Sequence, residues 1–77
     1  MEIVYEYVRV AEALARQIEA GEIPKGGRLP NERELAEVYR VSAGTVRRAV
    51  QELRARGLVA TLAGKGTFVI AGAADES

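Results

Sequence analysis

The chain contains neither cysteine nor histidine among its 77 residues. The absence of cysteine excludes disulfides and thiolate chemistry, and the absence of both residues removes the usual zinc ligands. Histidine is also the side chain that most often serves as a general base near neutral pH. We therefore expect a protein that is not an enzyme, with no catalytic residues, no metal site and no cofactor.

Long hydrophobic runs are also missing, and none approaches the roughly 18 residues that a membrane-spanning helix needs. The N-terminus is acidic and of mixed polarity, whereas a secretory signal is basic and then apolar. We expect a cytoplasmic protein without a membrane partner. A chain of this length forms one small domain with a modest core.

Charge is balanced in total but uneven along the chain. The 11 basic and 11 acidic residues give a formal net charge of zero. Residues 1–37 hold five basic and eight acidic side chains, whereas residues 40–57 hold a single acid, Glu52. The second segment holds five arginines: Arg40, Arg47, Arg48, Arg54 and Arg56. This concentration of positive charge is what an element facing DNA requires.

Three helices are predicted from apolar spacing and capping signals. The first covers about residues 5–20. After an extended segment before Pro30, Asn31 and Glu34 form a capping box for a second helix. The third begins at Ser42, and its core-facing stripe is Val46, Ala49, Val50 and Leu53. Two helices joined by a short turn, with a basic outward face on the second, are typical of a helix-turn-helix.

After the third helix come two apolar runs, Leu58–Leu62 and Thr67–Ala71, joined by a glycine-rich link. This pattern predicts a β-hairpin. The element order predicts a mainly α fold with a small β-hairpin, a winged helix-turn-helix of three helices and a two-stranded wing. The expected boundaries are 1–71 for the domain, about 32–51 for the helix-turn-helix, about 58–71 for the wing and 72–77 for a disordered tail or linker.

Five short motifs follow one another over residues 20–69, and the resemblance that they carry covers about residues 5–69. They are AGEIP (Ala20–Pro24) with Gly27, LPNERELA (Leu29–Ala36), VSAGTVRRAVQEL (Val41–Leu53), GLV (Gly57–Val59) and GKGTFV (Gly64–Val69). Their joint order and spacing resemble the GntR family of bacterial transcription regulators. The resemblance implies an N-terminal winged helix that binds operator DNA. In that family a larger C-terminal domain binds a small effector, and dimers bind palindromic sites, but the resemblance implies nothing about an effector for this chain.

The sequence departs from the family pattern in the turn and at the start of the third helix. Arg40 stands where the family often has glycine, and a left-handed backbone there would cost on the order of 1 kcal/mol. Ala43 and Gly44 stand where the family commonly has arginine and threonine, and that arginine is a frequent base contact. We therefore expect a target that differs from the family's usual operator.

The expected mechanism places the N-terminal end of the third helix in the major groove of DNA. Arg47 is the candidate base contact, because its guanidinium can bind guanine O6 and N7 together. Gln51 could contact adenine or stay solvated, and Ala43 can offer only an apolar contact. Ser42 and the helix N-terminus suit a phosphate, and Thr45 suits a phosphate or a thymine methyl group.

The remaining candidates lie around this helix and in the wing. Arg48 is expected at a phosphate, and Gly44 would let the helix backbone approach DNA closely. By family resemblance Arg33 contacts the DNA backbone. Lys65 would lie over the minor groove or a phosphate, because the flanking glycines permit positive φ. The full predicted set is Arg33, Ser42, Ala43, Gly44, Thr45, Arg47, Arg48, Gln51, Gly64, Lys65, Gly66 and Thr67.

Interpretations without DNA stay open for several of these residues. Arg33 could be only an ion-pair partner of Glu37, and residues 64–66 could be an ordinary hairpin loop. Arg54 and Arg56 are most simply a solvated helix face. The aromatic side chains are expected in the core or at its edge.

The leading hypothesis is a sequence-specific transcription regulator, expected to repress, with double-stranded palindromic operator DNA as its partner. The neutral net charge supports an alternative, a winged-helix module that binds a partner protein. We expect a monomer in solution that pairs weakly on DNA, unless a C-terminal effector domain supplies a homodimer.

Overall fold

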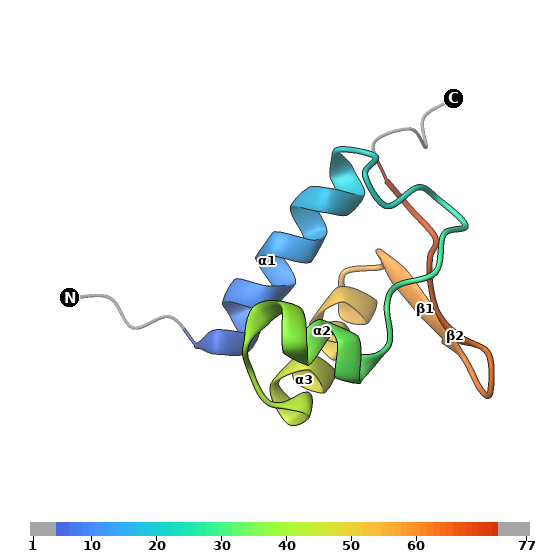
Figure 1. The fold of residues 1–77 in the computed structure, drawn as a ribbon. Coiled ribbons are helices and arrows are strands. Elements are labelled where there is room, and N and C mark those ends of the chain that lie inside the picture. Colours follow the sequence, from blue (N-terminus) through green and yellow to red (C-terminus); the bar gives the residue numbers. More distant parts are fainter. Residues whose placement is uncertain (1–4, 73–77) are drawn as a thin grey trace.

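The computed structural model describes residues 5–72. Its elements are α1 (Glu6–Glu19), α2 (Glu32–Tyr39), α3 (Ala43–Ala55), β1 (Val59–Leu62) and β2 (Gly66–Val69) (Figure 1). Three helices followed by a two-stranded antiparallel hairpin confirm the predicted winged helix-turn-helix. The predicted tail lies outside the described residues except for Gly72. Within residues 5–72, no helix is long and apolar enough to cross a membrane.

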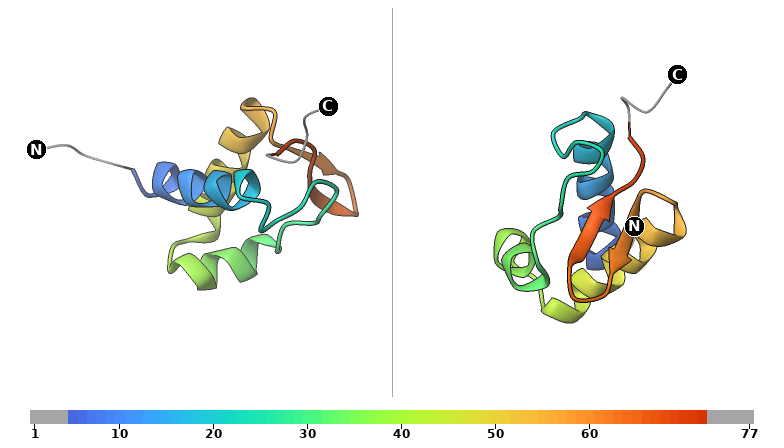
Figure 2. Two further views of the ribbon diagram at one scale, coloured as in Figure 1. Left: turned by 90° about the horizontal axis from the view of Figure 1, so that it is seen from above. Right: turned by 90° about the vertical axis from the view of Figure 1, so that its right-hand side faces the viewer.

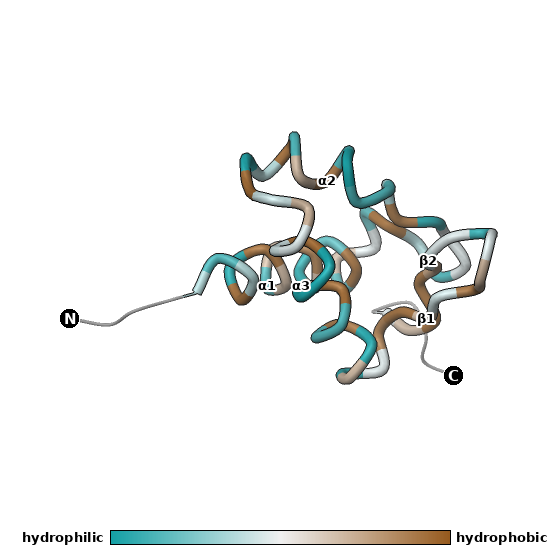
Figure 3. Tube along the Cα trace, turned by 90° about the horizontal axis from the view of Figure 1, so that it is seen from below, coloured by the Kyte–Doolittle hydropathy of each residue, from teal (hydrophilic) through white to brown (hydrophobic). Residues whose placement is uncertain are grey.

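Helix α3 lies at the centre of the fold, because both α1 and α2 pack against it. Its apolar stripe is buried, and Val46, Ala49 and Leu53 are 0% exposed. Figure 2 shows α2 on one side of α1 and the hairpin near the C-terminal end of α1. Hydrophobic residues recur between hydrophilic ones along each helix (Figure 3). Each helix therefore turns one face to the core and the other to water.

Side-chain caps define where α2 and α3 begin. Asn31 Oδ1 accepts a hydrogen bond from the Glu34 backbone N–H at 2.8 Å. Glu34 Oε1 accepts from the Asn31 backbone N–H at 2.9 Å, which completes the predicted capping box. Ser42 Oγ accepts from the Thr45 backbone N–H at 3.1 Å and caps α3 in the same way. These bonds satisfy backbone donors that the first turn of a helix leaves without partners.

The turn from α2 to α3 passes through a left-handed residue. Arg40 has φ 58° and ψ 49°, which is a left-handed backbone. The steric cost on the order of 1 kcal/mol that such a backbone imposes on a non-glycine residue therefore applies here. Within residues 5–72 Arg40 is the one non-glycine residue with positive φ. The backbone N–H groups of Arg40 and Val41 both bond to the carbonyl oxygen of Ala36. The turn therefore reverses the chain tightly and brings the start of α3 beside α2.

The hairpin is joined by the segment that precedes α2. Arg28 forms an antiparallel bridge with Phe68, and the Leu29 backbone N–H donates to the carbonyl oxygen of Thr67 at 2.8 Å. This is the extended conformation predicted before Pro30. Leu29 is 3% exposed and anchors the segment in the core. Because neighbouring side chains of an extended chain point to opposite sides, Arg28 points outward.

We expect Arg40→Gly to raise the free energy of unfolding by roughly 0.5–1 kcal/mol, because glycine adopts the left-handed conformation without a steric penalty. Urea denaturation followed by circular dichroism measures the change. Arg16→Gly, inside α1, is the matched control and should lower stability, because glycine is unfavourable in a helix interior. A loss of stability in Arg40→Gly would contradict the prediction.

Candidate nucleic-acid interface

The N-terminal end of α3 exposes Ser42, Ala43 and Gly44. The Ser42 hydroxyl accepts from the Thr45 backbone N–H and donates to Thr45 Oγ1 at 3.0 Å. Because the Ser42 hydroxyl is already used for capping, the Thr45 hydroxyl is the one whose hydrogen can still be donated outward. The first turn of α3 carries no acidic side chain. The dipole of α3 favours an anion at this end, and no side chain of the first turn supplies one.

Gly44 has no structural need to be glycine. A Cβ added at this position would meet only the Ser42 hydroxyl oxygen, at 3.8 Å, which is an ordinary van der Waals distance. The residue is exposed and lies in the first turn of α3. Its lack of a side chain leaves the helix backbone open to close approach by a ligand.

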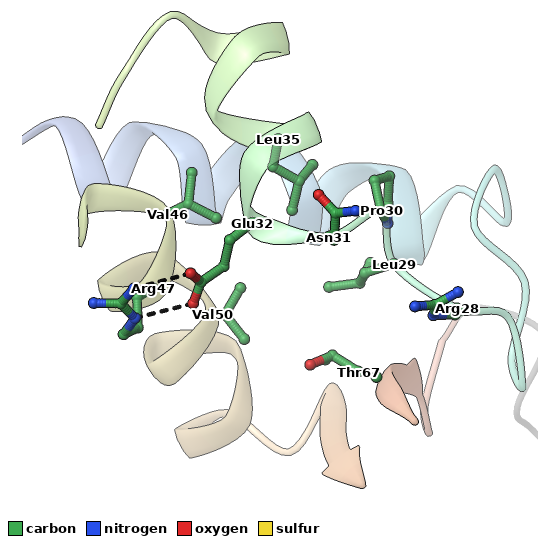
Figure 4. Close-up of a pocket in the computed structure, with 11 residues that line it drawn as sticks. Arg28, Leu29, Pro30, Asn31, Glu32, Leu35, Val46, Arg47, Val50 and Thr67 are labelled. Carbon is green, nitrogen blue, oxygen red and sulfur yellow. Dashed lines mark hydrogen bonds and ion pairs between the residues drawn. The ribbon is translucent and has the colours of Figure 1, made fainter. Parts of the chain in front are cut away.

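Arg47 forms a two-pronged ion pair with Glu32 at the start of α2 (Figure 4). Arg47 Nε donates to Glu32 Oε2 at 3.0 Å, and Nη2 donates to Oε1 at 2.9 Å. These hydrogen bonds, helped by the charge of Arg47, lower the pKa of Glu32 below its ordinary value, and the carboxylate raises the pKa of Arg47. The side chains stay 59% and 44% exposed, so the pair adds little to stability. The predicted base contact is therefore oriented by Glu32, a partner that no local pattern in the sequence indicates.

Arg48 lies over the ring of Tyr7 from α1. The guanidinium carbon is 4.5 Å from the ring centre, a distance at which the positive charge is attracted to the π-face. Tyr7 in turn stacks on Tyr5, with the ring centres 6.1 Å apart. Tyr5 is 67% exposed, so the expectation that the aromatic side chains lie in the core or at its edge was wrong for this residue. Gln51, further along α3, is exposed.

The last two arginines of the α3 region have partners within the fold. Arg56 donates to Glu12 Oε2 at 2.7 Å and to Glu52 Oε2 at 3.1 Å, which ties α3 to α1. The hydrogen bonds to Glu12 and then to Glu52 raise the pKa of Arg56. Arg54 Nη1 donates to the hydroxyl of Thr61 in β1 at 2.8 Å. Both side chains belong to exposed residues, as predicted, but each of them also joins two elements.

Arg33 in the first turn of α2 and Lys65 in the hairpin turn are exposed basic residues. In the part of the chain from 5 to 72, the ion pair considered between Arg33 and Glu37 is not formed. The hairpin turn has positive φ at Gly64 (74°) and Gly66 (128°), as its glycines suggested. Arg33 and Lys65 therefore present basic groups without ion-pair partners among the described residues.

A hollow of about 190 Å³ opens between α3 and the hairpin (Figure 4). Arg47 and Glu32 line it from the helical side, and Gly66, Thr67 and Arg28 line it from the side of the hairpin. Arg28 is absent from the predicted set of site residues. The proline two positions later indicates an extended segment, but no local signal indicates that this segment lies against the wing.

A family model described as bacterial regulatory proteins of the gntR family matches residues 6–69. The HTH-type transcriptional repressor NagR of Bacillus subtilis is 44% identical over 63 residues, which are 82% of this chain and 26% of NagR. The HTH-type transcriptional regulator Rv0792c of Mycobacterium tuberculosis is 48% identical over 61 residues, which are 79% of this chain and 23% of that protein. The chain thus spans about a quarter of the length of these relatives.

Solved structures of DNA-binding domains have the same fold. The DNA-binding domain of AraR in complex with operator ORR3 has a TM-score of 0.83 and 34% identity. That match covers 88% of this chain and 82% of the AraR chain. A structure of a GntR-family transcriptional regulator has a TM-score of 0.79 and 36% identity, over 87% of this chain and 26% of that one.

We expect the pKa of the Glu32 carboxyl, measured by NMR titration, to lie below the ordinary glutamate range and to return to that range in Arg47→Ala. The pair stabilises the fold above the unfolded-state pKa, and this small contribution is lost as the pH falls through the folded-state pKa. Arg48→Ala, which removes the neighbouring arginine, is the control and should leave the titration of Glu32 unchanged. A wild-type pKa in the ordinary range would show that the pair does not form in solution.

Proposed function

This chain belongs to the gntR family of bacterial regulatory proteins, and we propose that it is the DNA-binding domain of a transcription regulator that represses genes by binding operator DNA. The observation that carries the proposal is the exposed face of α3, opposite its buried stripe. The operator complexes of the AraR domain, which has the same fold, support it.

In the proposed complex, the N-terminal half of α3 enters the major groove. Arg47 is the base contact, since its two-pronged geometry toward Glu32 is also the geometry that guanine O6 and N7 require. To contact a base, Arg47 exchanges at least part of its bonding to Glu32. Gln51 lies one turn further along the same face and can bind adenine N6 and N7.

Contacts to the DNA backbone surround this base-contacting face. Thr45 donates its hydroxyl hydrogen to a phosphate beside the N-terminus of α3. Arg48, held against Tyr7, contacts a second phosphate, and Arg33 a third. Lys65, in the turn of the wing, contacts the minor groove or a phosphate beside it. Such contacts fix the position of the domain without selecting a sequence.

The wider assignment follows from the same proposal. The domain covers residues 1–71, and residues 72–77 form a tail or linker. A homodimer on a palindromic operator, formed on DNA or through an effector domain in the same protein, would place two such domains on successive half-sites. The protein acts on DNA in the bacterial cytoplasm and is not an enzyme. The partner-protein alternative is not favoured, because the relatives are named as transcriptional regulators and repressors.

Selection from a pool of duplexes with randomised central positions tests the proposal directly. The chain should enrich a defined sequence. The logarithm of its affinity for that duplex should fall linearly with the logarithm of the salt concentration, because binding releases counterions from the phosphates. Fluorescence anisotropy with the selected duplex and a scrambled one measures both properties. Equal affinity for the two duplexes, or a flat salt response, would refute specific operator binding.

Arg47→Ala should reduce discrimination between the selected duplex and a duplex changed at one guanine by roughly tenfold to a hundredfold, because a bidentate guanine contact is lost. Arg48→Ala is the matched control. It should weaken binding to all duplexes to a similar extent, because a phosphate contact carries no sequence information. If Arg47→Ala also weakened all duplexes equally, Arg47 would be a phosphate contact.

Gly44→Ala should raise the stability of the domain by up to about 1 kcal/mol, because alanine has the higher helix propensity and meets no obstacle in the protein. It should nevertheless weaken DNA binding, since the added methyl group keeps the helix backbone away from the groove. Gly57→Ala is the control and should lose stability, because Gly57 has φ 78°. Unchanged DNA affinity in Gly44→Ala would show that the backbone does not approach DNA closely there.

A further inference from the structure

Arg28 is fixed in the fold more firmly than an ordinary surface arginine. Its backbone forms an antiparallel bridge with Phe68 of β2. The next residue, Leu29, is buried, and its N–H bonds to the carbonyl oxygen of Thr67. The backbone on both sides of the Arg28 side chain is therefore anchored to the wing and to the core, and the side chain can only project outward.

The Arg28 side chain lies across the backbone of Gly66, where β2 begins. A Cβ built at Gly66 would stand 2.6 Å from Nε of Arg28 and 3.4 Å from its Cζ. The guanidinium group thus occupies the space that a side chain at position 66 would need. Within residues 5–72, Arg28 forms no hydrogen bond or ion pair through its side chain. Its five N–H donors are available to a ligand.

In the proposed complex, one strand of the DNA would pass across the hollow beside Arg28. The hollow separates α3, which would enter the major groove, from the wing, which would meet the minor groove. Adjacent major and minor grooves of a duplex are divided by one sugar–phosphate strand. That strand has to pass across the hollow if both elements bind at once. A phosphate of the strand would then lie on the hairpin side of the hollow, beside Arg28 and away from the carboxylate of Glu32 on the helical side.

We propose that Arg28 is a phosphate-binding residue, which binds the backbone of the DNA strand that passes between α3 and the wing. The inference rests on the proposed DNA-binding function and adds a contact that neither the wing turn nor the helix-turn-helix supplies. The planar guanidinium forms paired, charge-assisted hydrogen bonds to phosphate oxygens. Glycine at position 66 leaves the guanidinium room in this position, and the φ of 128° at Gly66 favours glycine there independently.

Salt titrations of DNA binding test the assignment. Arg28→Ala should weaken binding to the selected duplex and to a scrambled duplex by a similar factor, and the slope of log affinity against log salt should become smaller by about one. Arg28→Lys should keep the slope but bind more weakly, because lysine retains the charge and lacks the guanidinium fork. Arg16→Ala, which removes an arginine from α1, is the matched control and should bind like the wild-type chain.

A double-mutant cycle examines the contact with Gly66. Gly66→Ala should weaken DNA binding in the wild-type background, partly by displacing Arg28. The same substitution should cost clearly less affinity in the Arg28→Ala background, because there is no guanidinium left to displace. Circular dichroism melting curves check that every variant is folded. Equal costs of Gly66→Ala in the two backgrounds would show that the contact does not position Arg28 for DNA.

The outcomes separate this inference from the function on which it rests. If wild-type binding is specific and salt-dependent while Arg28→Ala has the wild-type slope and affinity, the Arg28 assignment is wrong and the proposed function stands. A loss confined to the selected duplex would make Arg28 a base contact and also overturn the assignment. If the wild-type chain itself binds without salt dependence, the proposed function fails and the Arg28 assignment fails with it.

Discussion

The burial of the apolar stripe of α3 is the constraint on which the rest of the structure depends. Val46 and Leu53 have no exposed surface, and burying side chains of this kind stabilises a fold by roughly 1.5–3 kcal/mol each. A rotation of α3 by one residue, about 100°, would remove them from the core and turn Arg47 toward it. An unpaired charge in that position would be strongly unfavourable. The core therefore decides which side chains of α3 face outward.

Features that depend on neighbours in the chain could be predicted from the sequence. The capping box of Asn31 and Glu34 and the cap at Ser42 involve residues three positions apart, so the residue types reveal the bonds. The helical stripe of α3 and the glycines of the hairpin turn are equally local. Even the left-handed backbone at Arg40 could be anticipated, because the family often has glycine there. These signals were sufficient for the element order and hence for the fold class.

Contacts between distant parts of the chain could not be predicted in the same way. Glu32 and Arg47 are 15 positions apart and meet only because the turn brings α2 beside the start of α3. Arg28 reaches Gly66 only because an extended segment joins the hairpin. Exposed pairs of this kind contribute little free energy, so they leave no strong pattern in the sequence. Tyr5 was misplaced for a related reason: its aromatic character does not reveal whether a core is within its reach.

The neutral net charge does not contradict DNA binding once the positions of the acids are known. Glu12 and Glu52 are paired with Arg56, which joins α1 to α3. Arg56 lies at the C-terminal end of α3, far along the helix from the proposed DNA contacts. Glu32 stands beside Arg47 at the proposed interface itself. Its carboxylate repels a phosphate, which carries a full negative charge, more strongly than it repels the acceptor atoms O6 and N7 of a neutral guanine. An acid in this position therefore weakens unspecific attraction at Arg47 more than it weakens a base contact, which favours selectivity over affinity.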